Sequence, residues 1–159
     1  MFHKEEYNGS REQNYDRLIR QLDALLEGET DIIANLSNAS SLLRQFLDDV
    51  NWVGFYMYKG EQLVLGPFQG LPACVRIPLS KGVCGKAASD RATVRVPNVH
   101  EFPGHIACDA ASQSEIVIPI VKNEELIGVL DIDSPILDRF DETDQRYLEK
   151  FVQHLIAHI

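Results

Sequence analysis

The chain has 159 residues, of which 45% are hydrophobic and 25% charged, and its formal net charge is −9. This length and composition suit one soluble domain with a core of its own. The negative charge argues against nucleic acid as a partner, because binding a phosphate backbone needs clustered Lys and Arg and no basic run is present. It also disfavours anionic membrane surfaces.

No apolar stretch reaches the roughly 20 residues that a membrane-spanning helix needs. Residues 1–6 are polar and lack the apolar segment of a signal peptide. We therefore expect the protein to stay in the cytoplasm. In that reducing compartment the three cysteines, Cys74, Cys84 and Cys108, argue against a permanent disulfide framework and leave core, metal and redox roles open.

Two helices are predicted before residue 50 from apolar residues that recur at helical spacing. The apolar face of the first consists of Tyr15, Leu18, Ile19, Leu22, Leu25 and Leu26. Gly28 ends that pattern. The apolar face of the second helix is predicted to consist of Ile32, Ile33, Leu36, Leu43 and Phe46.

Strands are predicted from Trp52 onward, because the sequence becomes aromatic-rich and β-branched between turn residues. They cover residues 52–58, 62–65, 75–79, 93–96, 115–121 and 126–132, with a short helix at 83–89. The last two strands are expected to form a hairpin around Asn123. The segment from Pro97 to Ser114 has little periodicity, and a loop of that length in a compact domain is more often functional than idle.

A final helix is predicted after Asp141, which is a suitable N-cap with acidic residues in the turn that follows. Its apolar face consists of Tyr147, Leu148, Phe151, Val152, Leu155, Ile156 and Ile159. The order of elements predicts an α+β fold, an antiparallel sheet packed by N- and C-terminal helices. Residues 1–159 are expected to form a single domain.

The three cysteines differ in their surroundings. A buried core role is the default for a free cysteine, and Cys84, at a predicted helix start, fits it. Cys74 and Cys108 lie in loops, where two thiols can pair reversibly if their Cα atoms lie within about 7 Å. The competing hypothesis is a zinc site of the three cysteines with His100 or His105, which lacks the usual close Cys-x-x-Cys-type pair.

Carboxylates gather at the end of the last predicted strand. A period of two places Ile127, Val129, Asp131 and Asp133 on one face, so that this face ends in two carboxylates about 7 Å apart. Like charges so placed are unfavourable unless a cation or a shared proton lies between them. Glu115 opens the partner strand and is expected near these acids. The alternative is that all three are solvated strand-end acids.

Trp52 and Tyr56 share a strand face with Gly54 between them. They either pack in the core or wall a small pocket, where Trp52 would cover an apolar group and Tyr56 would offer a hydroxyl. Together these residues suggest a site with aromatic walls, acidic groups and a nearby thiol. Such a site suits a substrate that carries an ammonium group.

Eight motifs in order carry a resemblance to a known family. They are residues 51–56 (NWVGFY), 65–70 (LGPFQG), 72–74 (PAC), 82–85 (GVCG), 96–100 (VPNVH), 102–109 (FPGHIACD), 114–117 (SEIV) and 128–134 (GVLDIDS). On these motifs the chain resembles the free methionine-R-sulfoxide reductases, a catalytic branch of the GAF fold whose other members usually sense small ligands.

The resemblance implies a role for each candidate residue. Cys108 is the nucleophile, Cys74 the resolving cysteine and Cys84 auxiliary. The substrate pocket consists of Trp52, Tyr56, Glu115, Asp131 and Asp133. The family resemblance further implies a homodimer that binds no metal or cofactor and is recycled by thioredoxin.

The resulting hypothesis is reduction of free L-methionine-R-sulfoxide. The Cys108 thiolate attacks the sulfoxide sulfur while Glu115 and Asp133 protonate the oxygen and Asp131 holds the ammonium group. Methionine leaves, and the Cys108 sulfenic acid condenses with Cys74 to a disulfide. The alternative is a non-catalytic GAF domain that binds a ligand or senses redox state. Such domains usually sit beside an output domain, and none is expected here.

Overall fold

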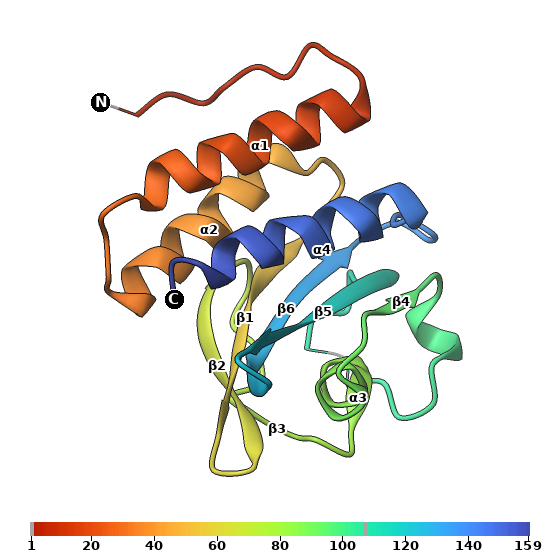
Figure 1. The fold of residues 1–159 in the computed structure, drawn as a ribbon. Coiled ribbons are helices and arrows are strands. Elements are labelled where there is room, and N and C mark those ends of the chain that lie inside the picture. The colour runs from red at the N-terminus through yellow and green to blue at the C-terminus, as the bar shows by residue number, and fades with distance from the viewer. Residues whose placement is uncertain (1, 107) are drawn as a thin grey trace.

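The computed structural model describes residues 2–106 and 108–159 and contains one antiparallel sheet of six strands in the order β3-β2-β1-β6-β5-β4 (Figure 1). The helices are α1 (Arg11–Leu26), α2 (Ile32–Phe46), α3 (Gly82–Asp90), the 3₁₀ helix η1 (Val99–Glu101) and α4 (Glu142–Ile156). The strands are β1 (Trp52–Lys59), β2 (Gln62–Gln69), β3 (Arg76–Pro78), β4 (Val94–Val96), β5 (Ser114–Lys122) and β6 (Glu125–Ser134). The predicted α+β class is confirmed.

Helices α2 and α4 cover one face of the sheet, and α1 packs across these two helices (Figure 1). Leu18 and Leu22 of α1 and Leu43 of α2 belong to the same buried cluster as Val53 and Phe55 of β1, and all five are fully buried. Each such side chain contributes about 1.5–3 kcal/mol through burial. The helical face of the sheet is therefore the main stabilising core.

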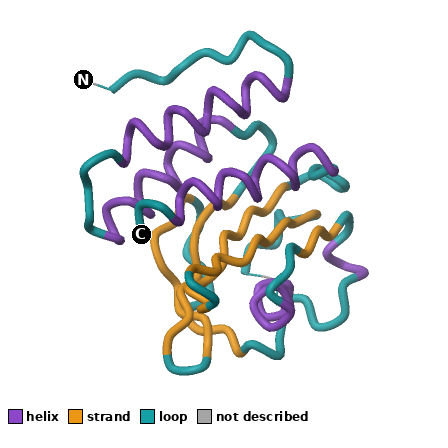
Figure 2. Tube along the Cα trace, in the orientation of Figure 1, coloured by secondary structure: helices purple, strands orange, loops and turns teal. Residues whose placement is uncertain are grey.

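The opposite face carries α3 and the loops of the chain segment between β2 and β5 (Figure 2). Because side chains alternate along a strand, Trp52 and Tyr56 of β1 point to this face, away from Val53 and Phe55. They pack with Val83 of α3 in a second, smaller cluster. Because the other face supplies most of the core, residues in the loops on this face are available to form a functional site.

Two expectations about individual side chains were wrong. Ile32 and Ile33 are 39% and 66% exposed, because Asp31 caps α2 and they occupy its first turn, beyond the packed surface. Ile127 packs on the helical face and not with Val129, because an irregularity in the β5–β6 pairing at Ile120 shifts its side chain to the other face. The hairpin turn at Asn123 was predicted correctly, and its positive φ of 52° suits an asparagine.

No helix of the described residues is both long and apolar enough to span a bilayer.

An ion-pair network joins the first and last helices. Arg11 contacts Asp141 at 2.7 Å and Asp144 at 2.8 Å, and the Tyr15 hydroxyl donates to Asp144 at 2.7 Å. Asp141 also caps α4 by accepting the Asp144 N–H. The Arg11 guanidinium holds the pKa of Asp141 well below its usual range.

We predict that Arg11→Gln lowers the free energy of unfolding by about 0.5–1 kcal/mol at neutral pH, since Arg11 and Asp141 are half exposed to solvent. An acid with a depressed folded pKa adds stability above its unfolded pKa, about 3.9, and loses it as pH falls through the folded pKa. The deficit should therefore shrink below about pH 4. Urea denaturation at several pH values measures this deficit in unfolding free energy. The control is Lys150→Gln, since the ion pair between Lys150 and Asp16 is exposed. A deficit that does not depend on pH contradicts the assignment.

Candidate active site

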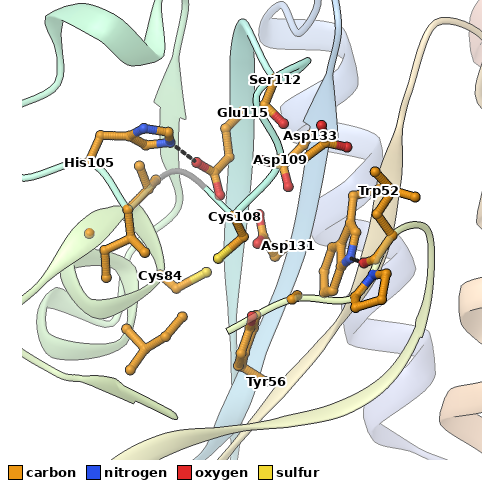
Figure 3. A pocket seen from close by; sticks show the side chains of 17 residues that line it. Trp52, Tyr56, Cys84, His105, Cys108, Asp109, Ser112, Glu115, Asp131 and Asp133 are labelled. Atoms are coloured by element: carbon orange, nitrogen blue, oxygen red, sulfur yellow. Dashed lines mark hydrogen bonds and ion pairs between the residues drawn. The ribbon is translucent and has the colours of Figure 1, made fainter. Parts of the chain in front are cut away.

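A pocket opens on the loop-bearing face of the sheet, and seven of the eight predicted site residues line it (Figure 3). The predicted residues in its lining are Trp52, Tyr56, Cys84, Cys108, Glu115, Asp131 and Asp133. The eighth, Cys74, is bonded to Cys108 at the rim. The fold thus brings together residues that are as much as 81 positions apart, from Trp52 to Asp133.

Cys74 and Cys108 form a disulfide, with their Cα atoms 6.1 Å apart. The reversible pairing that the sequence left open is therefore sterically available. The Cys74 backbone is held from two sides: its carbonyl accepts the Tyr56 hydroxyl at 2.9 Å, and its N–H donates to the Cys108 Sγ at 3.4 Å. Cys108 is exposed, whereas Cys74 is half-buried. The pair therefore lies at the mouth of the pocket.

Three carboxylates lie deeper in the pocket. The β5–β6 register sets Glu115 directly opposite Asp133 and Val117 opposite Asp131, so that the three acids share one sheet face. Burial raises the pKa of each carboxyl well above its usual range. The charges of the neighbouring acids, Asp133 on Glu115 and Glu115 on Asp131, raise the pKa values further. The cluster therefore retains protons at pH values where exposed acids are ionised.

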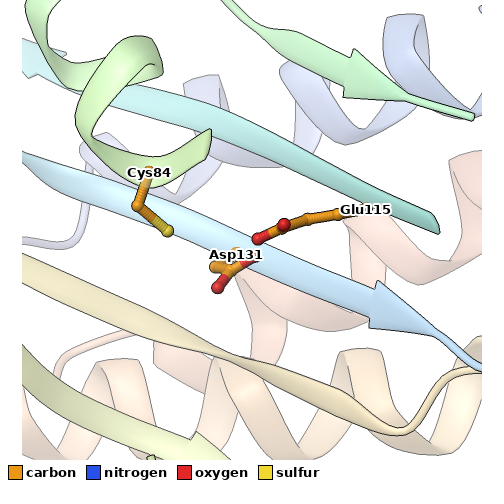
Figure 4. A group of neighbouring side chains, drawn as sticks. All are labelled: Cys84, Glu115 and Asp131. Carbon is orange, nitrogen blue, oxygen red and sulfur yellow. The ribbon is translucent and has the colours of Figure 1, made fainter. Parts of the chain in front are cut away.

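Cys84 lies beside two of these acids. Its Sγ and carboxylate oxygens of Glu115 and Asp131 all lie within 4.8 Å of one another (Figure 4). Burial, and then the charge of Asp131, raises the pKa of the Cys84 thiol well above its usual range. A thiol in that state is a weak nucleophile. The position supports an auxiliary role and argues against Cys84 as the attacking group.

The three grouped atoms are of types that bind metal ions, but they are not the predicted zinc set. Cys74 and Cys108 cannot both be thiolate ligands while their sulfurs are bonded to each other. His105 lines the pocket, whereas His100 lies outside its lining. The zinc hypothesis as the sequence framed it is therefore incompatible with this state of the protein.

Trp52 and Tyr56 both pack in the second core cluster and both line the pocket. Trp52 stacks on Phe68 and Tyr56, with ring centroids 5.1 and 5.9 Å apart, and also lines the pocket. A Cβ at Gly54 would collide with Phe68 and with the Trp52 ring, so glycine is required there. The indole N–H donates to the Leu71 carbonyl at 3.1 Å, which fixes the ring plane at the pocket wall.

Sequence reasoning missed a clamp on the segment that follows Cys108. The Asn51 amide donates to Asp109 Oδ2 at 2.9 Å and to Ser112 Oγ at 3.1 Å. Asp109 also accepts the Ala111 N–H at 2.8 Å, and its charge helps to raise the pKa of Asp133. These hydrogen bonds fix the Cys108 loop to the start of β1. Single polar residues in loops have no periodic signal, so only their place in the motifs marked them.

His105, which the sequence suggested only as a zinc ligand, instead contacts an acid: its Nε2 lies 3.5 Å from Glu115 Oε1 (Figure 3). Burial lowers the pKa of this imidazole, so the neutral form is favoured beside the acids. The next residue, Ile106, packs over Gly82 at the start of α3, where an added Cβ would lie 3.2 Å from it. His105 and Ile106 thus hold the Cys108 loop on the side opposite the Asn51 clamp.

The GAF domain family model matches residues 22–159, which agrees with the class of fold just described. Protein YtsP of Bacillus subtilis (strain 168) is 58% identical over 157 residues, covering 98% of this chain and 96% of that protein. The free methionine-R-sulfoxide reductase of Escherichia coli (strain K12) is 52% identical over 141 residues, covering 89% of this chain and 86% of that enzyme.

A solved structure of free methionine-R-sulfoxide reductase from Neisseria meningitidis in complex with its substrate is also similar. The two have a TM-score of 0.94 and 40% identity, covering 99% of this chain and 95% of that one. The chain therefore belongs to the GAF domain family and, within it, to the free methionine-R-sulfoxide reductases. The resemblance drawn from the eight motifs is confirmed.

We predict that Glu115→Gln stabilises the fold at neutral pH. Glu115 has a raised folded pKa, so the folded state binds more protons than the unfolded state and stability falls as pH rises above the unfolded pKa of about 4.3. Glutamine removes that cost. The melting temperature should rise by about 2–4 °C per kcal/mol of relief at pH 7, and the gain should vanish near pH 4. A variant that melts lower than wild type at pH 7 contradicts the assignment.

We predict that exchanging the Asn51 and Asp109 side chains restores the rate of methionine formation that a single substitution lowers. Asn51→Asp places two carboxylates at the present 2.9 Å contact, and should slow methionine formation about 10-fold or more through displacement of the Cys108 loop. The double variant Asn51→Asp with Asp109→Asn recreates the hydrogen bond in reverse. Single-turnover rates measure the effect. A double variant no faster than Asn51→Asp would contradict a positioning role for the clamp.

Proposed function

We propose that this protein reduces free methionine-R-sulfoxide to methionine, with Cys108 as the nucleophile and Cys74 as the resolving cysteine. The observation that carries the proposal is the bonded Cys74–Cys108 pair at the mouth of a pocket that also holds the acids Glu115, Asp131 and Asp133. The similarity to the E. coli enzyme and to the substrate-bound Neisseria enzyme supports it.

In the proposed reaction the Cys108 sulfur attacks the sulfoxide sulfur, and the oxygen passes to Cys108 as the methionine sulfur leaves. The S–O bond breaks only if protons meet the charge that grows on the oxygen, and such general acid catalysis typically contributes about 10²–10⁴-fold. Glu115 and Asp133 are the proposed donors, because burial raises the pKa of both carboxyls, and the charge of Asp133 on Glu115 and of Asp131 on Asp133 raises them further. Cys74 then condenses with the Cys108 sulfenic acid, which forms the disulfide and releases water.

The same pocket accounts for recognition of a free amino acid. Among the described residues the buried Asp131 Oδ1 has no hydrogen-bond partner, and a substrate ammonium group would supply one. Trp52 offers a flat apolar wall for the substrate methyl group. A peptide-bound methionine sulfoxide has no ammonium group at that position and would leave Asp131 unpaired.

Completion of the cycle requires a reductant. We propose that thioredoxin reduces the Cys74–Cys108 disulfide by thiol–disulfide exchange in the cytoplasm, and that Cys84 remains an auxiliary thiol. In line with the family resemblance, we propose a homodimer that needs no bound metal or cofactor. The disulfide at the exposed mouth of the pocket supports the recycling step, because a protein reductant must reach a sulfur directly.

Replacing each of the two cysteines in turn tests the proposal. Cys74→Ser should release about one methionine per active site in a single turnover and then stop, because the sulfenic acid on Cys108 has no resolving thiol. Cys108→Ser should release none. Methionine is quantified by mass spectrometry, and the modified cysteine is identified in the same sample. Turnover by Cys108→Ser would overturn the assignment, and no release by Cys74→Ser would favour a ligand-sensing domain.

A further inference from the structure

The two chain segments that carry the bonded cysteines are free of charged side chains up to Arg76 and Asp109, which follow them directly. A quarter of the chain is charged, yet residues 66–75 and 102–108, which carry Cys74 and Cys108, contain no Asp, Glu, Lys or Arg. Leu71 and Val75, on either side of Cys74 in the chain, are 60% and 59% exposed. We call Leu71, Pro72 and Val75 the apolar rim, since all three are exposed and apolar. Exposed apolar groups next to a reactive centre favour contact with another protein.

The two cysteines of the disulfide differ in how exposed they are to solvent. Cys108 is exposed. Cys74 is half-buried against the second core cluster, and its carbonyl is held by the Tyr56 hydroxyl at 2.9 Å. Access to the attacked sulfur is one of the factors that govern thiol–disulfide exchange. Access therefore favours Cys108 as the sulfur that a reductant meets.

One contact favours the other outcome. The Cys74 N–H donates to Cys108 Sγ at 3.4 Å, which would stabilise Cys108 as the leaving thiolate if Cys74 were attacked. A single long N–H to sulfur contact contributes little to the stability of that thiolate. A half-buried cysteine, by contrast, is less accessible to a folded partner than an exposed one. We expect access to decide the outcome.

We propose, resting on the proposed function, that the recycling dithiol protein docks on the apolar rim and attacks the Cys108 Sγ. Its thiolate forms a bond to Cys108 while the Cys74–Cys108 bond breaks, and Cys74 leaves as a thiolate that takes up a proton. The second thiol of the partner then attacks the sulfur of the partner's first cysteine in the mixed disulfide. This attack releases Cys108 as a thiol. Two electrons pass from the partner to this protein, and the partner leaves with a disulfide.

The docking part is tested by driving the enzyme with two reductants. Val75→Glu, which lies on the rim and outside the pocket lining, should raise the KM for a Cys-x-x-Cys thioredoxin about 10-fold or more, because a charge enters an apolar contact. Turnover driven by dithiothreitol should not change, since a small dithiol needs no docking surface. The matched control is Ile33→Glu, at a 66% exposed position in α2.

These assays separate failure of docking from failure of the proposed function. If dithiothreitol supports no methionine formation in wild type, the proposed function itself fails. If dithiothreitol supports turnover but Val75→Glu and Ile33→Glu have the same KM for thioredoxin, only the docking surface is overturned. Loss of dithiothreitol-driven turnover in Val75→Glu would also overturn it, because the rim would then act on the chemistry.

The attacked sulfur is identified in the wild-type protein, without any variant of this chain. A thioredoxin whose second active-site cysteine is serine forms a mixed disulfide that cannot resolve. We expect the conjugate on Cys108, with Cys74 free to react with iodoacetamide, as shown by peptide mass spectrometry. A conjugate on Cys74 with Cys108 alkylated would overturn the proposal.

Discussion

The register of the β5–β6 hairpin is the constraint on which the site depends. It sets Glu115 opposite Asp133 and places Asp131 on the same face, so that three carboxylates lie together, with the Cys84 thiol beside Glu115 and Asp131. Burying like charges is unfavourable, and the fold tolerates it because the helical face supplies a separate, apolar core. The cost of burial is what keeps protons on these acids, and retained protons are what the proposed chemistry needs.

One face of the sheet supplies most of the stabilising core, and the other face carries the reactive groups. On one face, α1, α2 and α4 bury a continuous apolar core; on the other, short strands and loops hold the cysteines at the mouth of the pocket. The Cys108 loop is fixed on one side by Asn51 and on the other by the contacts of His105 and Ile106. The nucleophile is thus positioned at the pocket by contacts that lie outside the main core.

Much of this arrangement follows from local patterns in the sequence. Helices, strands and the Asn123 hairpin were predictable, because periodicity and turn residues are local signals, and the hairpin in turn predicted the acid cluster. Ile127 was misplaced because a pairing irregularity has no signature in alternation. The Cys74–Cys108 bond and the Asn51–Asp109 contact join segments 34 and 58 residues apart, so their proximity depends on the whole fold.

Recognition of the substrate ammonium group by the buried acids is the central claim, and removing that group tests it most directly. With dithiothreitol as reductant, methionine formation is compared for free L-methionine-R-sulfoxide, its S epimer and the N-acetylated R-sulfoxide. The account predicts rapid conversion of the first alone, because the others misplace the oxygen or leave Asp131 unpaired. Equal conversion of the N-acetylated compound would contradict it.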